Sequence, residues 1–244
     1  MPSSTVDAGA APARPGVLGR ALGVIFSPRE TFQHVAADPK WFAALALVAV
    51  VGALAVGGFL MTEVGQRAWL DQAVTQSEAW SGAPVSDQQY AGMERMAPYA
   101  SYMAIAQMVI GIPLVLAVLS GVLFAAFNAV LGGASTFRQL FAVVVHSTFI
   151  WVVGWIFVMP LNYARESMSS PTNLSAFVPM LDEQAFFTRL LGAVDLFMVW
   201  WTIVLAIGLA VLYRRRTQPI LFAFLGIYAV IAIGVAAFLA SRNG

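Results

Sequence analysis

The chain has 244 residues, of which 60% are hydrophobic and only 10% charged, and its formal net charge is +1. An ordinary soluble domain has about 25% charged residues, so this composition excludes a soluble globular protein and indicates one membrane domain. The small net charge gives no basis for nucleic-acid binding. Without cysteine, and with two histidines far apart in sequence, no disulfide, metal site or cofactor is expected.

The first forty residues precede the long apolar runs. Residues 1–15 are small and Pro-rich, which is typical of a disordered tail, and they lack the pattern of a secretory signal. Residues 16–40 predict short amphipathic and capped helices. In the first helix, apolar residues recur at helical spacing with Arg20 on the opposite face. This helix can lie in the membrane interface or pack against the protein's own loops, and the sequence leaves both open.

A second short helix has a clear start signal. Ser27 can cap it, Pro28 fits the first turn, and Glu30 can complete a capping box. The Asp-Pro pair that ends at Pro39 repeats the signal before Trp41, an aromatic residue suited to the membrane–water boundary. The two signals predict a rigid elbow that leads into the first span.

Five stretches of the remaining chain carry almost no charge. A helix that crosses about 30 Å of hydrocarbon needs roughly 20 apolar residues, because each residue adds about 1.5 Å. We therefore predict an all-α, polytopic membrane protein in which residues 41–244 form a domain of five transmembrane helices. The predicted spans cover residues 41–61, 105–131, 141–161, 190–212 and 220–239.

Prolines and turn residues set the expected ends of these helices. The uncharged run 96–137 lacks turn residues near its middle, which favours one long helix that starts outside the bilayer and is kinked at Pro113. The third span is expected to stop near Pro160. In the polar connection before the long helix, Ser86 and Gln89 form a second capping-box candidate.

The cations between the spans predict the orientation. When the tails and the connections between spans are assigned alternately to the two sides of the membrane, one side has eight cations. The other side has five cations, mixed with acidic residues. Because cytoplasmic loops carry an excess of Lys and Arg, we expect a cytoplasmic N-terminus, an outside C-terminus and a place in the inner (cytoplasmic) membrane of the cell. The eight are the topology anchors Arg214, Arg215 and Arg216, together with Arg14, Arg20, Arg29, Lys40 and Arg138.

Asp195 is the one acidic residue inside a predicted span, about five residues from its outer end. A charge within the bilayer is costly and finds a partner, which favours a structural bond to a neighbouring helix or loop. The functional reading is an ion-coupling or gating carboxylate. The polar side chains expected at its level, near the outer boundary, are Asn162, Arg165 and Arg189.

Three further polar residues lie in the predicted spans: His146, Asn128 and Gln107. Helix arithmetic puts His146 and Asp195 about 16 Å apart in depth, which argues against a proton-relay pair. We expect His146 to be a neutral side chain bonded to Asn128 or to a hydroxyl, with a titrating switch as the alternative.

Two features of the last spans suggest contacts rather than chemistry. Small residues recur at four-residue spacing in the last span, which permits internal packing or a homo-oligomer. The Arg214–Arg216 run can touch lipid phosphate, although three cations fall short of the roughly four to eight expected of a lipid-recognition cluster.

Several motifs, taken in order, resemble one family. Ile-Phe-Ser-Pro-Arg-Glu-Thr-Phe followed by Asp-Pro-Lys-Trp occupies residues 25–41, and stretches around 137–147 and 195–209 continue the likeness. The chain resembles the prokaryotic branch of the Yip domain family, the Ypt/Rab-interacting proteins, from about residue 16 to its end. The leading motif comprises Ser27, Pro28, Glu30, Thr31, Phe32, Pro39 and Trp41.

This resemblance implies a five-helix membrane domain with a cytoplasmic N-terminus. Eukaryotic members of the family are associated with small GTPases and with transport vesicles between the endoplasmic reticulum and the Golgi. The present chain has no obvious Rab-docking domain, so GTPase binding is not transferred to it.

The sequence leaves three classes of function to weigh. A non-enzymatic adaptor, which organises another membrane complex such as an ABC-type exporter or assists membrane trafficking or export, is the first hypothesis. A small transporter or channel that uses the polar residues of the bundle is the alternative. An enzyme is not expected, because no catalytic motif is present; a cavity shared by Asp195, Arg165 and Arg189 would revive it.

Overall fold

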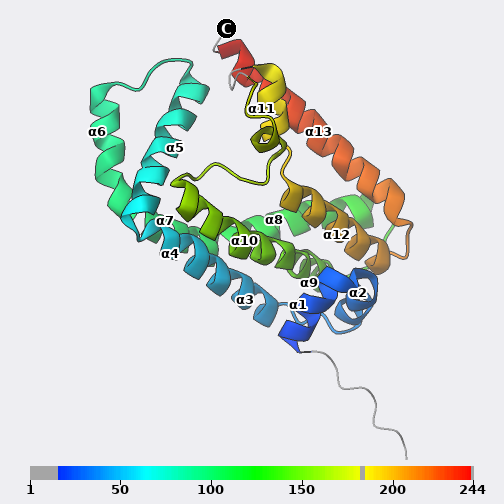
Figure 1. The fold of residues 1–244 in the computed structure, drawn as a ribbon. Coiled ribbons are helices and arrows are strands. Elements are labelled where there is room, and N and C mark those ends of the chain that lie inside the picture. The colour runs from blue at the N-terminus through cyan, green and yellow to red at the C-terminus, as the bar shows by residue number, and fades with distance from the viewer. Residues whose placement is uncertain (1–15, 182–184, 243–244) are drawn as a thin grey trace, which may run out of the picture.

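The computed structural model describes residues 16–181 and 185–242. The structure is 82% helical and forms no strand among these residues, which confirms the all-α prediction. The tail predicted for residues 1–15 lies outside the described part. The helices α1 and α2 lie at one end of the molecule, and the last described helix, α13, finishes at the opposite end (Figure 1).

Four helices among the described residues are long and apolar enough to cross a membrane, which makes the chain a multi-pass membrane protein. A fifth apolar helix, α12, has 17 residues and is about 26 Å long, at the lower limit for a span. The four are Phe42–Leu60 (α3, Phe42–Gly52; η1, Ala53–Gly57; α4, Gly58–Leu60), Asp87–Val130 (α6, Asp87–Met96; η2, Ala97–Tyr99; α7, Ala100–Ala106; η3, Gln107–Gly111; α8, Ile112–Phe124; η4, Ala125–Val130), Phe137–Arg165 (α9, Phe137–Ser147; α10, Phe149–Arg165) and Thr217–Arg242 (α13).

The remaining elements are short or polar. They are α1 (Val17–Phe26), α2 (Pro28–Ala37), α5 (Glu63–Ser81), η5 (Leu174–Phe177), α11 (Phe186–Gly192) and α12 (Leu196–Leu212). α5 and α6 run beside each other at one side of the molecule (Figure 1), and α6 buries none of its residues. The capping box predicted at Ser86 and Gln89 is confirmed at the start of α6.

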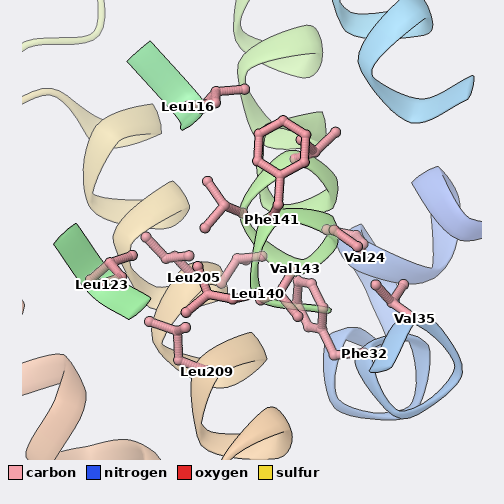
Figure 2. Close-up of a cluster of buried hydrophobic side chains, with 14 of the residues drawn as sticks. Val24, Phe32, Val35, Leu116, Leu123, Leu140, Phe141, Val143, Leu205 and Leu209 are labelled. Carbon is pink, nitrogen blue, oxygen red and sulfur yellow. The ribbon is translucent and has the colours of Figure 1, made fainter. Parts of the chain in front are cut away.

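The core is built around α9, which is buried on every side from Leu140 to Ser147. A helix that is apolar all round belongs in the interior of a bundle. Side chains from α1, α2, α8 and α12 surround it, as Figure 2 shows for Val24, Phe32, Leu116 and Leu205. The two short N-terminal helices are therefore part of the core rather than appendages of it.

The helical segment Asp87–Val130 has 44 residues and measures about 66 Å along its path. Because this length is about twice the hydrocarbon thickness, part of the helix extends beyond the bilayer. It bends at the 3-10 turn Ala97–Tyr99, so that α6 points away from the line of α7 and α8 (Figure 1). Its hydrogen bonding changes to the wider π pattern at Gln107–Gly111, directly before Pro113. A proline has no N–H to donate, and the π turn accommodates its ring without ending the helix.

Two predicted helix ends differ from the structure. The third span does not stop at Pro160, because α10 continues through it to Arg165. The predicted fourth span, residues 190–212, is broken between α11 and α12. The side chain of Asp195 caps α12 at this break, so the carboxylate stands at the start of α12 rather than within a helix.

The small residues of α13 divide between two surroundings. Ala232 and Ala236 are buried against the molecule, whereas a Cβ at Gly226 or Gly234 would meet open space. Half of the pattern therefore serves internal packing. A homo-oligomer through the other half stays a prediction.

Candidate functional site

Arg20 joins the two N-terminal helices to the start of the first span. Its side chain is only 6% exposed, and it donates to the backbone carbonyl of Asp38 at 3.1 Å and to the Asp38 carboxylate at 3.3 Å. Lys40 lies 3.0 Å from the same carboxylate. The sequence had placed Arg20 on the outward face, because its helical period alone does not show that a carboxylate from the elbow folds back onto it.

The predicted capping box at Ser27 is wrong. The Ser27 side chain makes no cap hydrogen bond, and instead the hydroxyl of Thr31 donates to the Ser27 carbonyl at 3.0 Å. The second predicted cap is missing as well, since α3 begins at Phe42 and Trp41, the residue before it, gives no side-chain cap. Trp41 packs edge-on against Phe141 with ring centroids 5.2 Å apart. The leading motif and its neighbours thus act through packing and through the ion pairs of Asp38 with Arg20 and Lys40.

Phe32 anchors α2 in the bundle. It is 0% exposed, and its ring lies against α9 and α12, close to Val143 and Gly208 (Figure 2). Gly208 makes this approach possible, because a Cβ there would lie 2.6 Å from Val143 and 3.1 Å from the Phe32 ring. Pro39, in contrast, is half-buried in the elbow.

Gln139 is a positioning residue that the sequence reasoning missed. It forms a capping box with Thr136 at the start of α9, and its amide nitrogen donates to the Ala36 carbonyl of α2 at 3.1 Å. The pattern Thr-x-x-Gln was the available signal. The bond ties the end of α2 to the central helix of the core.

The outer face of α1 is an apolar stripe made of Leu18, Leu22 and Phe26. Their exposed fractions are 66%, 58% and 79%. The opposite face carries Arg20 and Val24, which are buried. The helix therefore packs on its own protein through one face and presents an apolar surface on the other. A position of this surface in the membrane interface stays a prediction.

His146 lies in the core, where it is 1% exposed. Its Nδ1 lies 2.7 Å from the Ala142 carbonyl, which can only accept, so the proton of a neutral ring is on Nδ1. The other nitrogen, Nε2, is buried without a hydrogen-bond partner among the described residues. The predicted hydrogen bond to Asn128 or to a hydroxyl is found with neither among the described residues, since the ring bonds to the Ala142 carbonyl.

Asn128 belongs to a network at the end of the long helix. Its Oδ1 accepts from the Tyr213 hydroxyl at 2.7 Å and from Ser135 at 3.2 Å, and its nitrogen donates to the Ser135 carbonyl at 2.7 Å. Asn128 thus fixes the loop before α9 to the end of α12. Gln107 is exposed on the surface of its helix and does not face the bundle interior.

Asp195 organises the break before α12. Its Oδ1 accepts from the backbone N–H groups of Phe197 and Met198, at 2.8 and 3.2 Å. Its Oδ2 accepts from the hydroxyls of Ser170 and Thr172, at 2.6 and 2.7 Å. Partial burial raises the pKa of Asp195, but these hydrogen bonds outweigh it and hold the pKa below its usual value. The carboxylate is a helix cap and the anchor of the polar loop.

The backbone adds to this anchor. The loop and the break form an isolated antiparallel bridge between Asn173 and Asp195, in which Leu174 donates to the Val194 carbonyl at 2.9 Å. The Tyr228 hydroxyl of α13 donates to the Ala193 carbonyl from the other side. Sequence reasoning had placed the aspartate about five residues inside a span, whereas in the structure it precedes α12. Its loop partners are too far away in sequence to be predicted from local patterns.

The predicted partners of Asp195 do not contact it among the described residues. Arg165 donates to Ser169 at 3.2 Å, and Asn162 is buried with its oxygen unpaired. Arg189 has one buried guanidinium nitrogen without a hydrogen bond, and it lines a pocket of about 660 Å³ with Arg165. Asp195 does not line this pocket, so the three residues do not share one cavity.

The chain matches one protein-family model. The model is described as the Yip1 domain, and the match covers residues 22–239, nearly the whole chain. The matched region takes in the α2 anchor, the core helix α9 and the Asp195 cap. No curated protein and no solved structure matches the chain.

Proposed function

The chain belongs to the Yip1 domain family, and from this premise we propose that it is a non-enzymatic adaptor that organises another membrane protein. The family is associated with membrane trafficking and is not known as enzymatic. An adaptor for export or trafficking agrees with this association. An ABC-type exporter is the candidate partner that we favour.

The observation that carries the proposal is the pair of helices α1 and α2, which we call the N-terminal hairpin (Val17–Ala37), docked on the bundle with its apolar stripe exposed. Arg20 and Phe32 fix α1 and α2 to the bundle, so the stripe of Leu18, Leu22 and Phe26 has a defined orientation. A rigid apolar surface binds a partner with little loss of conformational entropy. Aromatic and large aliphatic side chains supply most of the binding energy in such contacts.

We further propose that the hairpin lies on the cytoplasmic side of the inner membrane and that the C-terminus lies outside. Arg29 of α2 and the Arg214–Arg216 turn line one pocket, which supports the assignment of these cations to the same side. The excess of cations on that side is the feature of cytoplasmic loops.

Co-purification from native membranes in mild detergent, with quantitative mass spectrometry, tests the adaptor proposal. We expect the chain to recover a membrane protein in a fixed ratio. The double variant Leu22→Ser/Phe26→Ser is expected to lower that ratio about tenfold, the effect of losing one strong contact residue. Both side chains are exposed, so the fold should be unaffected.

The double variant Phe177→Ser/Phe187→Ser is the matched control, because both phenylalanines are exposed and lie outside the hairpin. It should leave the ratio unchanged. Recovery of the chain alone, or an equal loss in both double variants, would contradict the proposal.

The transporter or channel alternative has lost two of its supports. Gln107 faces outward, and the oxygens of Asp195 are occupied by four donors. The unpaired nitrogen of His146 is the feature that still favours it. A flux in reconstituted vesicles that falls in His146→Ala would favour transport over the adaptor.

A further inference from the structure

Four arginines meet at the end of the bundle where the N-terminal hairpin docks. Arg29 of α2 and Arg214, Arg215 and Arg216 of the turn between α12 and α13 line one pocket of about 830 Å³. The turn alone supplies three cations in sequence. The fourth comes from a helix at the other end of the chain, which the fold places beside it.

These arginines carry charge that the described part of the protein does not neutralise. All four are exposed, and no Asp or Glu of the described residues lines the pocket. Arg215 donates to the backbone carbonyl of Leu131 at 2.6 Å, which fixes its side chain while leaving its charge in place. Asp38, an acid of the same end of the chain, is engaged by Arg20 and Lys40.

An apolar groove begins at three of these arginines, Arg214, Arg215 and Arg216. It has a volume of about 610 Å³ and continues along α13, away from the turn. Its apolar lining comes from the end of the long helix and from one face of α13: Phe127, Leu131, Ala223, Phe224 and Ile227. Because α13 is a membrane-spanning helix with most of its surface exposed, this groove faces the region of the acyl chains.

We propose that the arginine pocket and the apolar groove together bind one anionic phospholipid, with its phosphate against the four arginines and an acyl chain along α13. A phosphate is a preferred acceptor for several guanidinium groups at once. A free phosphate would use only the polar pocket, whereas a phospholipid satisfies the charge and the groove together. Four clustered cations next to a spanning helix also reach the lower limit for recognition of anionic lipids.

Titration of the full-length, delipidated protein in mild detergent, followed by native mass spectrometry, tests this proposal. We expect phosphatidylglycerol to bind at least about fivefold more tightly than phosphatidylcholine, and Arg29→Gln and Arg216→Gln each to weaken phosphatidylglycerol about fivefold. Arg138→Gln is the matched control, because Arg138 is an exposed cation at the start of α9 outside both pockets.

A second variant distinguishes a lipid from a simple anion. Ala223→Trp fills the groove without changing charge, and it should weaken phosphatidylglycerol while leaving the binding of soluble glycerol phosphate unchanged. Equal binding of the two lipids, equal effects of Arg29→Gln and Arg138→Gln, or competition by glycerol phosphate at the affinity of the lipid would overturn the proposal.

Discussion

Phe32→Ala is expected to lower the free energy of unfolding by about 3–5 kcal/mol, the range for removing a buried aromatic side chain. The ring is 0% exposed and fills the space above Gly208 between α2, α9 and α12. Because the ring lies in the packed core around α9, its removal leaves a cavity that the surroundings fill only in part. Unfolding in detergent, followed by tryptophan fluorescence, measures the change.

Phe26→Ala is the matched control for this variant. Phe26 is 79% exposed at the end of α1, so its removal should change the free energy of unfolding by less than about 0.5 kcal/mol. If Phe32→Ala and Phe26→Ala had similar small effects, the hairpin would not be part of the core. The adaptor proposal would then lose the rigid surface on which it depends.

Asp195→Ala is expected to destabilise the protein by about 2–4 kcal/mol. The substitution removes a helix cap and leaves the hydroxyls of Ser170 and Thr172 without their acceptor. Asp195→Asn should lose much less, because the amide oxygen can still cap α12 and the amide nitrogen can donate to the two hydroxyls. The unfolding midpoint in detergent distinguishes the two variants.

Asp71→Ala serves as a control for loss of one acidic side chain, since Asp71 is exposed on α5. If Asp195→Ala lowered the unfolding midpoint no more than Asp71→Ala does, the Asp195 cap would not contribute to the stability of the protein. The lowered pKa of Asp195 adds a pH test. Its contribution should be complete above the pKa of the unfolded state and should be lost only as the pH falls through the lower folded pKa.

The all-α membrane architecture and the family could be predicted from the sequence, because both depend on local information. The sequence predicts five spans, whereas four helices of the described residues are long enough to cross a membrane and α12 is shorter. The length of an uncharged run shows directly whether it can cross the membrane. The motif around Phe32 can be recognised because its residues are close together in sequence. The family match over residues 22–239 confirms the resemblance. The continuous helical segment that ends at Val130 could also be predicted locally, because the middle of the uncharged run lacks turn residues.

The polar contacts could not be predicted, because their partners lie far apart in sequence. Asp195 is held by hydroxyls of residues 170 and 172, and Arg20 by Asp38. At Ser27 a local rule failed although its capping pattern is complete in sequence. The Ser27 side chain makes no cap hydrogen bond, and the bond that forms there is from the Thr31 hydroxyl to the Ser27 carbonyl.

Site-specific photocrosslinking in native membranes tests the central claim most directly. A photoreactive residue placed at Leu22 should give one dominant adduct with another membrane protein, whereas the same residue at Phe177, which is equally exposed, should give none. The first result would locate a protein partner on the apolar stripe. Adducts with lipid alone at Leu22, or the same protein adducts at both positions, would contradict the account of this protein as an adaptor.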